Sequence, residues 1–543
     1  MAQQAAAAPS RAARSHRLYI PIILLTIIVA IFFLPAAWAW ADWDETLLQY
    51  IEMVGTMVLL LCLALLLVWF FFLSRFSWVA RFLGLVFLLL CGVAYPFLVL
   101  KVEFDANWHL HPIFVWQGDP AARFRDYRAS QGDVSDLPPI DLTIDTEHDF
   151  PRFRGFSADG VVKGIRLQPD WTEKPKVIWK HPCGGGYAGF AVAGNVLVTI
   201  EQRDENEAVV CYDRASGRER WAYEYEARFH RSEPMGGDGP RATPTIADGA
   251  VYSLGATGYF VCLDGETGKP RWGFNILEKT GSKNIEWGMS GSPLIVHDLV
   301  IVNPGADSAE NAGKALVGYN RADGKESWNG GDHKAGYSSP QISTLCGVPQ
   351  ILLFDASGLA GYDSKDGKEL WSYSWETMMG MNTIQPLVIG EDRILISSEL
   401  ENGCALVEVK KDGEEFTATE VWKSKKLGAK FSSLVTSGGA IYGLSNNRLV
   451  CLDAATGEQK WRGGNYGHGQ LLLVGDVILV SGEAGQIALV AVDPEKFRET
   501  AHMQVFSGDA FTGKSWNTPA LAGNHLCLRT HTEMACVELP LAK

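Results

Sequence analysis

Three long apolar runs occupy the first hundred residues, and short apolar strands separated by turns fill the rest of the chain. The runs span residues 18–41, 53–74 and 82–100, and none of them contains a charged residue. Each has about the 20 residues that an α-helix needs to cross a bilayer core of roughly 30 Å. The pattern predicts a three-helix transmembrane anchor over residues 18–100. For the first run, a cleaved signal peptide ending near residue 41 is the alternative.

The charges that flank these runs predict one orientation. Arg11, Arg14 and Arg17 precede the first run, and Arg75 and Arg81 lie between the second and third, whereas the first loop carries only acidic charges. Basic loops remain in the cytoplasm. Residues 1–17 are therefore predicted to form a cytoplasmic tail. Everything after the anchor should lie on the periplasmic side of the inner (cytoplasmic) membrane, with the helices in contact with lipid.

A connector is expected over residues 101–175, because its middle is polar and rich in turn residues. His109 and His111 form an H-x-H pair there. No further ligand follows within reach in the sequence, and a metal site needs three or four ligands. We therefore predict no metal at this pair.

A repeat begins beyond residue 175. Its unit is an acidic or amide residue, three residues, glycine, three residues and tryptophan, and it starts at Asp213, Asp264, Asn320, Asp363 and Asp453. The first side chain can accept backbone N–H groups of a turn, and the glycine supplies a positive φ. The tryptophan offers a large planar surface that can pack between neighbouring sheets. We therefore read the unit as a strand, a turn and a second strand.

Degenerate copies extend the series to eight aromatic residues. Trp179 begins it, Trp422 fills a gap, and Phe506 stands where the last aromatic is due. Two further short strands precede each unit, which makes four strands per repeat. The pattern predicts an all-β eight-bladed β-propeller over residues 176–543. The strand that contains Trp179 should pair with the C-terminal strands and close the ring.

The tandem unit resembles the tryptophan-docking repeat of the pyrroloquinoline quinone (PQQ) family over residues 175–540. That superfamily contains quinoprotein alcohol and glucose dehydrogenases and also the BamB-like propeller of outer-membrane assembly. The segments FRGFSADG at 153–160 and GDGPRATPTIADGAVYSLGATG at 237–258, with the helices before them, resemble PQQ-like membrane proteins of planctomycete-type bacteria. A shared fold does not decide between these functions.

The resemblance implies a cofactor site only in the dehydrogenase branch. Those enzymes hold PQQ in the axial funnel over a Ca²⁺ ion with Glu and Asn ligands and an Asp base, and the alcohol dehydrogenases add a disulfide between adjacent cysteines. This chain has no adjacent cysteines and no C-x-x-C-H haem motif. Glu286 and Asp238 are the carboxylates closest in sequence to the expected funnel. Cys211, Cys262 and Cys451 recur two residues before the repeat Asp and are predicted to be small buried residues.

The funnel lining is predicted from the segments that lead into the first strand of each repeat. Cationic, amide and aromatic residues there can bind a planar anionic ligand by charge-assisted hydrogen bonds and stacking. The alternative is the polar, wet lining of any propeller channel. The candidates are Arg241, Trp287, Tyr337, Asn382, Lys430, His468 and Trp516. No catalytic residue and no metal ligand is predicted, and the acidic segment EQRDENE at 201–207 is expected to be a solvated loop.

The charge balance limits the partners. The chain has 48 Lys and Arg against 62 Asp and Glu, a net charge of −14, which excludes nucleic acid as a partner because phosphate binding needs clustered cations. We expect a membrane-anchored envelope scaffold that binds proteins or a ligand on the propeller surface. The alternative is a PQQ-dependent dehydrogenase that oxidises alcohols or sugars and passes electrons to the membrane quinone pool. PQQ and Ca²⁺ are expected only under that alternative.

Overall fold

The structure is a computed structural model. It describes residues 19–29, 45–74, 76–104, 110–114, 119–145, 148–230, 236–398, 402–507 and 515–542. The chain divides into two compact units, Met1–Trp116 and Gln117–Lys543. Residues 30–41 of the first apolar run lie outside the described residues, as do His109 and the flanking Arg11, Arg14, Arg17 and Arg75.

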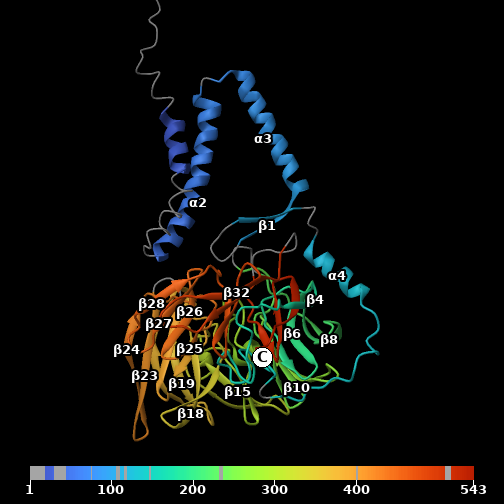
Figure 1. The fold of residues 1–543 in the computed structure, drawn as a ribbon, viewed down its shortest axis with the longest axis vertical. Helices are drawn as coiled ribbons and strands as arrows, with labels where there is room; N and C mark the ends of the chain where they lie inside the picture. The colour runs from blue at the N-terminus through green and yellow to red at the C-terminus, as the bar shows by residue number, and fades with distance from the viewer. Residues whose placement is uncertain are drawn as a thin grey trace, which may run out of the picture. The chain divides into compact units, whose positions relative to one another are not determined.

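The first unit contains helices at all three apolar runs, together with a short β-hairpin (Figure 1). Helix α2 (Glu45–Val68) continues into the π-helical turn η1 (Trp69–Leu73), and α3 (Trp78–Leu98) is followed by β1 (Val99–Phe104) and β2 (Leu110–Phe114). Within the described residues, one helical stretch, Trp78–Tyr95, is long and apolar enough to cross a membrane. Tyr19–Val29 and Val58–Leu73 are shorter apolar helices. A three-helix anchor therefore remains a prediction.

The second unit is an eight-bladed β-propeller, as the repeat predicts. Seven of its sheets have four strands and one has five. The blades are numbered from the first complete repeat. Blade 1 contains β5 (Ala191–Ala193), β6 (Val196–Arg203), β7 (Asn206–Asp213) and β8 (Glu219–Glu226); blade 2 contains β9 (Thr245–Ala247), β10 (Ala250–Leu254), β11 (Tyr259–Asp264) and β12 (Pro270–Asn275); blade 3 contains β13 (Leu294–Val296), β14 (Leu299–Val302), β15 (Leu316–Asn320) and β16 (Glu326–Gly330).

The remaining blades follow the same plan. Blade 4 contains β17 (Gln341–Leu345), β18 (Val348–Asp355), β19 (Gly358–Asp363) and β20 (Glu369–Ser374); blade 5 contains β21 (Leu387–Ile389), β22 (Arg393–Ser398), β23 (Gly403–Asp412) and β24 (Glu415–Ser424); blade 6 contains β25 (Val435–Ser437), β26 (Ala440–Ser445), β27 (Arg448–Asp453) and β28 (Gln459–Gly463). Blade 7 contains β29 (Gln470–Val474), β30 (Val477–Ser481), β31 (Gln486–Ala491) and β32 (Glu499–Gln504), with β3 (Val161–Val162) added parallel to β29.

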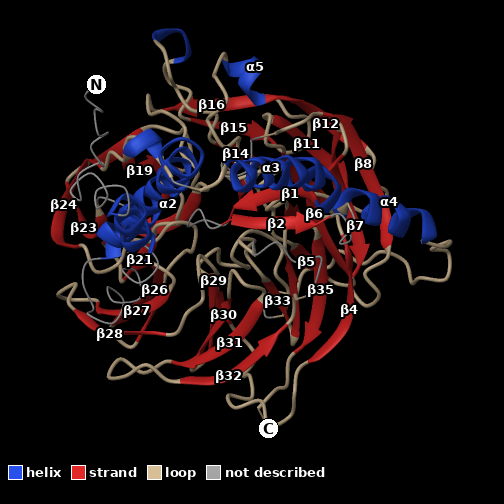
Figure 2. Cartoon of the chain, turned by 90° about the horizontal axis from the view of Figure 1, so that it is seen from above, coloured by secondary structure: helices blue, strands red, loops and turns tan. Residues whose placement is uncertain are grey.

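Blade 8 closes the ring with strands from both ends of the propeller sequence. It contains β33 (Ala520–Ala522), β34 (His525–Arg529), β35 (Glu533–Glu538) and β4 (Lys176–Pro182). Strand β4 pairs antiparallel with β35, and Trp179 stands opposite Cys536. The predicted closure by the strand of Trp179 is confirmed. Figure 2 shows the blades arranged around one axis, with first strands such as β5, β29 and β33 near the centre and fourth strands at the rim.

The repeat unit forms the contact between neighbouring blades. In blade 1, the Asp213 carboxylate accepts the backbone N–H of Ser216 at 2.9 Å, and Gly217 has a φ of +71°. Trp179 of blade 8 lies against Gly217 and donates its indole N–H to the carbonyl of Arg214 at 3.0 Å. The same indole-to-turn hydrogen bond recurs from Trp221, Trp272, Trp422 and Trp461. The predicted roles of the three repeat residues are confirmed.

Phe506 is not the eighth member of this series. The docking tryptophan stands opposite the third strand next to a register shift, as Trp461 stands opposite Cys451. In blade 7 that place belongs to Ala501, opposite Leu489. Blade 8 supplies no docking turn, because β35 and β4 come from opposite ends of the propeller and are not joined. Phe506 follows β32 and is completely buried in the core between the blades.

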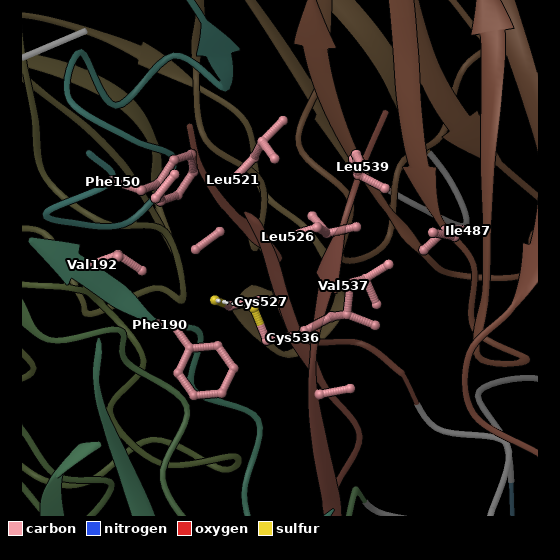
Figure 3. Packing of buried hydrophobic residues seen from close by; sticks show 14 of the residues in the cluster. Phe150, Phe190, Val192, Ile487, Leu521, Leu526, Cys527, Cys536, Val537 and Leu539 are labelled. Atoms are coloured by element: carbon pink, nitrogen blue, oxygen red, sulfur yellow. Dashed lines mark hydrogen bonds between the residues drawn. The ribbon is translucent and has the colours of Figure 1, made fainter. Parts of the chain in front are cut away.

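The core fills the spaces between adjacent sheets. Where blades 7, 8 and 1 meet, Phe190 and Val192 pack with Leu526, Cys527 and Val537 in one cluster (Figure 3). Such burial of apolar surface contributes about 25 cal/mol per Å². Each blade therefore depends on its two neighbours for stability.

The predicted connector also contains ordered structure. Helix α4 (Pro120–Ser130) begins at Asp119, whose carboxylate accepts the backbone N–H of Ala121 at 3.1 Å. Further along, Phe150 pairs with Val192 of blade 1 in an isolated β-bridge. The connector is thus in part a layer on the propeller.

Candidate functional site

Eight residues lie in the segments that lead into the first strands, and all but His468 stand four residues before their strand, whereas His468 stands two residues before β29. We call this set the axial collar; its members, in blade order 1 to 8, are Tyr187, Arg241, Ser290, Tyr337, Thr383, Phe431, His468 and Trp516. First strands of neighbouring blades contact one another, for example β5 with β9 and β9 with β13. The collar therefore marks the end of the axis where those strands begin.

Hydrogen bonds between neighbouring blades are formed by the residues that lie two positions after the collar residues, and these bonds hold the collar in place. The backbone N–H of Thr243 donates to the Ser292 hydroxyl at 3.0 Å, and that of Ser292 donates to the Ser339 hydroxyl at 2.9 Å. The N–H of Gly189 likewise donates to Thr243, and that of Gln385 to Ser433. Each bond joins one blade to the next. The S/T-x-P segments of the sequence thus hold the blades at fixed spacing.

Aromatic rings form an arc over three blades of the collar. The rings of Tyr187 and Trp516 stack with centroids 5.0 Å apart and an interplanar angle of 26°. Trp516 also contacts Phe431 at 5.0 Å, and Tyr187 contacts His531 at 5.2 Å. Such an arc presents planar faces to a ligand or a partner side chain.

Arg241 supplies a cation beside this arc. Its guanidinium carbon lies 4.8 Å from the ring centroid of Phe229 and 5.5 Å from that of Tyr187. Its N–H groups donate to the carbonyls of Gly236 and Gly239, and no carboxylate of the described residues forms an ion pair with it. Burial lowers the pKa of Arg241 to about 10, so it keeps its charge at neutral pH. Arg241 is a half-buried cation that forms no salt bridge with a described carboxylate, although the charges of Glu207 and Asp238 raise its pKa, and such a cation favours an anionic ligand.

Three other predicted residues lie close to this arrangement. Trp287 meets Tyr337 edge to face at 5.8 Å, and the Lys430 ammonium lies 5.7 Å from the ring of Phe431. Trp287 itself precedes the collar register, which Ser290 occupies in blade 3. The structure therefore brings most of the predicted funnel residues to one end of the axis.

Asn382 and His468 form hydrogen bonds with other loops and strands of the propeller. The Asn382 amide is completely buried and donates to the carbonyls of Asp355 at 2.7 Å and Trp375 at 3.0 Å. In blade 5 the collar position belongs to Thr383. His468 is also buried, and its backbone N–H donates to the Glu483 carboxylate at 3.0 Å.

Sequence reasoning missed Tyr187 and Phe431. Both stand at the same distance from their first strand as Arg241 does, so the repeat register would have found them. Their blades lack the proline that marks this segment in blades 2 to 5. His531 lies in the turn between β34 and β35, where no repeat signal points to the axis.

The segment 201–207 is not the solvated loop that its charges suggest. Glu201, Arg203 and Glu207 belong to β6 and β7 and are buried. The Tyr225 hydroxyl donates to Glu207 at 2.6 Å, and the Ala256 N–H donates to it at 3.0 Å. Burial raises the pKa of Glu207 to about 7. The charge run was misleading because β6 is buried on both faces, so that only the turn residues Asp204 and Glu205 of this segment are exposed.

The residues near the collar do not fit a PQQ and Ca²⁺ site. Glu483 accepts the indole N–H of Trp516 at 2.7 Å, and the Asp238 carboxylate contacts His230 and Arg228. Asn382 donates to main-chain carbonyls. In the part of the chain that the structure describes, no three His, Cys, Asp or Glu side chains gather as metal ligands. Calcium needs six to eight oxygen ligands.

A cavity of about 640 Å³ lies between the loops of blades 2 to 4. Lys283, Asp307, Lys334, Glu376 and Met379 are among its lining residues. Acidic and basic side chains are mixed there, so the lining selects no ligand charge.

The comparison with protein families decides the relationship of the chain. The family model described as outer membrane protein assembly factor BamB matches residues 168–252 and 232–463. The chain belongs to this PQQ-repeat (BamB) family. Among solved structures, BamB from Moraxella catarrhalis is 15% identical with a TM-score of 0.48, and the match covers 67% of this chain and 98% of that one.

Quinoproteins are also among the solved structures that resemble this PQQ-repeat chain. The quinohemoprotein alcohol dehydrogenase ADHIIG from Pseudomonas putida HK5 is 11% identical with a TM-score of 0.48, over 74% of this chain and 84% of that one. A europium-containing methanol dehydrogenase is 11% identical with a TM-score of 0.42, over 72% and 98%. The comparison with curated proteins finds no match.

Proposed function

We propose that the chain is a membrane-anchored propeller that binds a protein or an anionic ligand at the axial collar and catalyses no redox reaction. One observation carries this proposal. Arg241 is a half-buried cation between two aromatic rings that forms no salt bridge with a described carboxylate, whereas Glu483, Glu207 and Asn382 hydrogen-bond to the propeller itself. The collar thus offers a cation and aromatic rings that can bind a ligand. The carboxylate and amide groups that could bind Ca²⁺ are already hydrogen-bonded within the propeller.

The anchor would hold the propeller at the inner membrane. The apolar helix Trp78–Tyr95 and the two shorter apolar helices support this part of the proposal. The basic and acidic flanks of the runs favour a propeller on the periplasmic side. Contact with lipid through three helices and a likeness to planctomycete-type membrane proteins both stay predictions.

The proposed partners are envelope proteins that present an acidic or aromatic segment. Cation–π and stacking contacts from Arg241, Tyr187 and Trp516 suit such a segment. The net charge of −14 disfavours nucleic acid. The alternative, a PQQ-dependent alcohol or sugar dehydrogenase, is disfavoured by the misfit of the oxygen ligands.

Site-specific photo-crosslinking in intact bacteria tests this proposal. A photoreactive phenylalanine analogue replaces Tyr337 in the collar or, as control, Lys365, which is exposed in a docking turn. Docking turns lie at the far ends of the strands, because successive strands of a blade are antiparallel. We expect a discrete adduct with an envelope protein from position 337, which Arg241→Gln weakens. The same adduct from position 365, or no adduct from position 337, would contradict the proposal.

A further inference from the structure

Two cysteines face each other across the strands of the closing blade. Cys527 of β34 and Cys536 of β35 are direct cross-strand partners. Their sulfur atoms lie 4.0 Å apart, and neither side chain is exposed (Figure 3). All described cysteines are free thiols in this structure.

The repeat explains Cys536 but not Cys527. The third-strand residue opposite a docking tryptophan is cysteine or glycine in every blade with such a tryptophan except blade 5, where it is Leu406. It is also cysteine at Cys211, Cys262 and Cys451. The second-strand residue beside it is bulky and apolar in the seven other blades. Those residues are Val198, Tyr252, Ile301, Leu352, Leu395, Tyr442 and Leu479. Cys527 is thus the exception at a position where packing alone selects a large side chain.

The strand geometry permits a bond between the two sulfurs. Directly opposed residues of antiparallel strands have Cα atoms about 4.5–5.5 Å apart, and disulfides span about 4.4–6.8 Å. The sulfurs need to approach by about 2 Å to reach the bond length of about 2.05 Å. Rotation about χ1 of either cysteine supplies a movement of this size.

Because both thiols are buried in the folded blade, we expect any reaction between them to precede the final packing of that blade. The hydrogen bond with Cys536 and burial raise the pKa of Cys527 well above its ordinary value, and the thiolate is the reactive form. Strands β34 and β35 are adjacent in sequence, so their hairpin can form before β4 arrives from the other end of the propeller. In that hairpin both thiols are still accessible.

We propose that Cys527 and Cys536 form an intrachain disulfide when the chain folds in the presence of a disulfide oxidant. One thiolate attacks a sulfur of the oxidant, for example oxidised glutathione, and releases one glutathione thiol. The second thiolate then attacks the mixed disulfide and releases the other. Two protein thiols become one disulfide, and the oxidant is reduced by two electrons. The bond fixes the register of the hairpin on which β4 closes the ring.

Proteolysis of the full-length chain tests the disulfide directly. The chain is unfolded in detergent and urea and refolded with oxidised glutathione or with dithiothreitol, and free thiols are then alkylated. Trypsin cleaves after Lys514 and Arg529, so the two cysteines fall in separate peptides, 515–529 and 530–543. We expect these peptides to be joined after oxidised refolding and to separate on reduction. The oxidant is added, so the result does not depend on the proposed location or partner.

Two variants keep the test specific. Cys527→Val restores the residue type of blade 1 and removes the joined peptides, and Cys451→Ala, which changes a third-strand cysteine without a cysteine partner, preserves them. We also expect oxidised refolding to raise the urea midpoint of the wild type but not of Cys527→Val. Alkylation or separate glutathionylation of both cysteines after oxidised refolding would overturn the proposal, as would pairing of either with another cysteine.

Discussion

The indole of Trp221 in blade 1 lies against Gly268 in the turn of blade 2 and donates its N–H to the carbonyl of Gly265 at 2.9 Å. This contact joins two blades through one aromatic side chain and one glycine. The Asp264 carboxylate accepts the N–H of Thr267 and shapes the turn that receives the ring. Because the same unit recurs, the docking contact sets how blades pack around most of the ring.

Gly268→Ala should be far more destabilising than Gly249→Ala. Both glycines have a φ near +70°, but a Cβ at Gly268 would lie 2.7 Å from the Trp221 ring, whereas one at Gly249 meets nothing within 4 Å. The left-handed conformation costs alanine roughly 1–2 kcal/mol at both sites, and overpacking adds about 1–3 kcal/mol at Gly268 alone. Urea unfolding of both variants measures the difference. Equal losses of unfolding free energy would contradict the docking role.

Arg203→Ala should cost about 3–5 kcal/mol of unfolding free energy, because it leaves a buried carboxylate unpaired. Arg203 contacts Glu201 at 2.7 Å and Glu219 at 2.8 Å, and the Glu201 side chain is 0% exposed. Its guanidinium also lies 5.5 Å from the ring of Phe124 in α4.

The matched control for Arg203 is Arg228→Ala, which removes the exposed ion pairs with Glu205 and Asp238. We expect it to cost less than about 1 kcal/mol. Adding Glu201→Gln to Arg203→Ala should recover part of the stability, because it removes the unpaired charge. No recovery in the double variant would show that the loss arises from packing.

The stability of the propeller should fall as the pH rises from about 4.5 to about 7 through the contribution of Glu207. Burial raises the pKa of Glu207 from 4.5 to about 7, so the folded state holds its proton where the unfolded state has lost it. Relative to wild type, Glu207→Gln should therefore gain stability between pH 5 and pH 8, by up to about 3 kcal/mol. Urea midpoints at both pH values measure this gain. A difference that does not change with pH would contradict it.

The sequence predicts the parts of the fold that depend on local chemistry. Asp213, Gly217 and Trp179 act as their residue types suggest, because turn geometry and aromatic docking are short-range effects. Phe506 was misplaced because aromatic spacing alone does not reveal that blade 8 lacks the turn on which a tryptophan would dock. A rule based on spacing fails where the ring closes.

The candidate site was predictable in position but not in membership. The register before each first strand locates Arg241 and Trp516, yet only packing shows that Asn382 turns its amide to the carbonyls of Asp355 and Trp375. His531 reaches Tyr187 from a turn between two other strands. Contacts of this kind depend on how the blades meet, which no local pattern records.

Binding of PQQ is the measurement that tests the account most directly. The purified full-length chain in detergent is titrated with PQQ and Ca²⁺ while quinone absorbance and protein fluorescence are followed, and dye reduction is then assayed with alcohols and aldoses. Because the carboxylate and amide groups near the collar are already hydrogen-bonded within the propeller, we expect no Ca²⁺-dependent, stoichiometric quinone complex and no turnover. A one-to-one complex that requires Ca²⁺ and reduces the dye with an alcohol or sugar would contradict the account and establish a dehydrogenase.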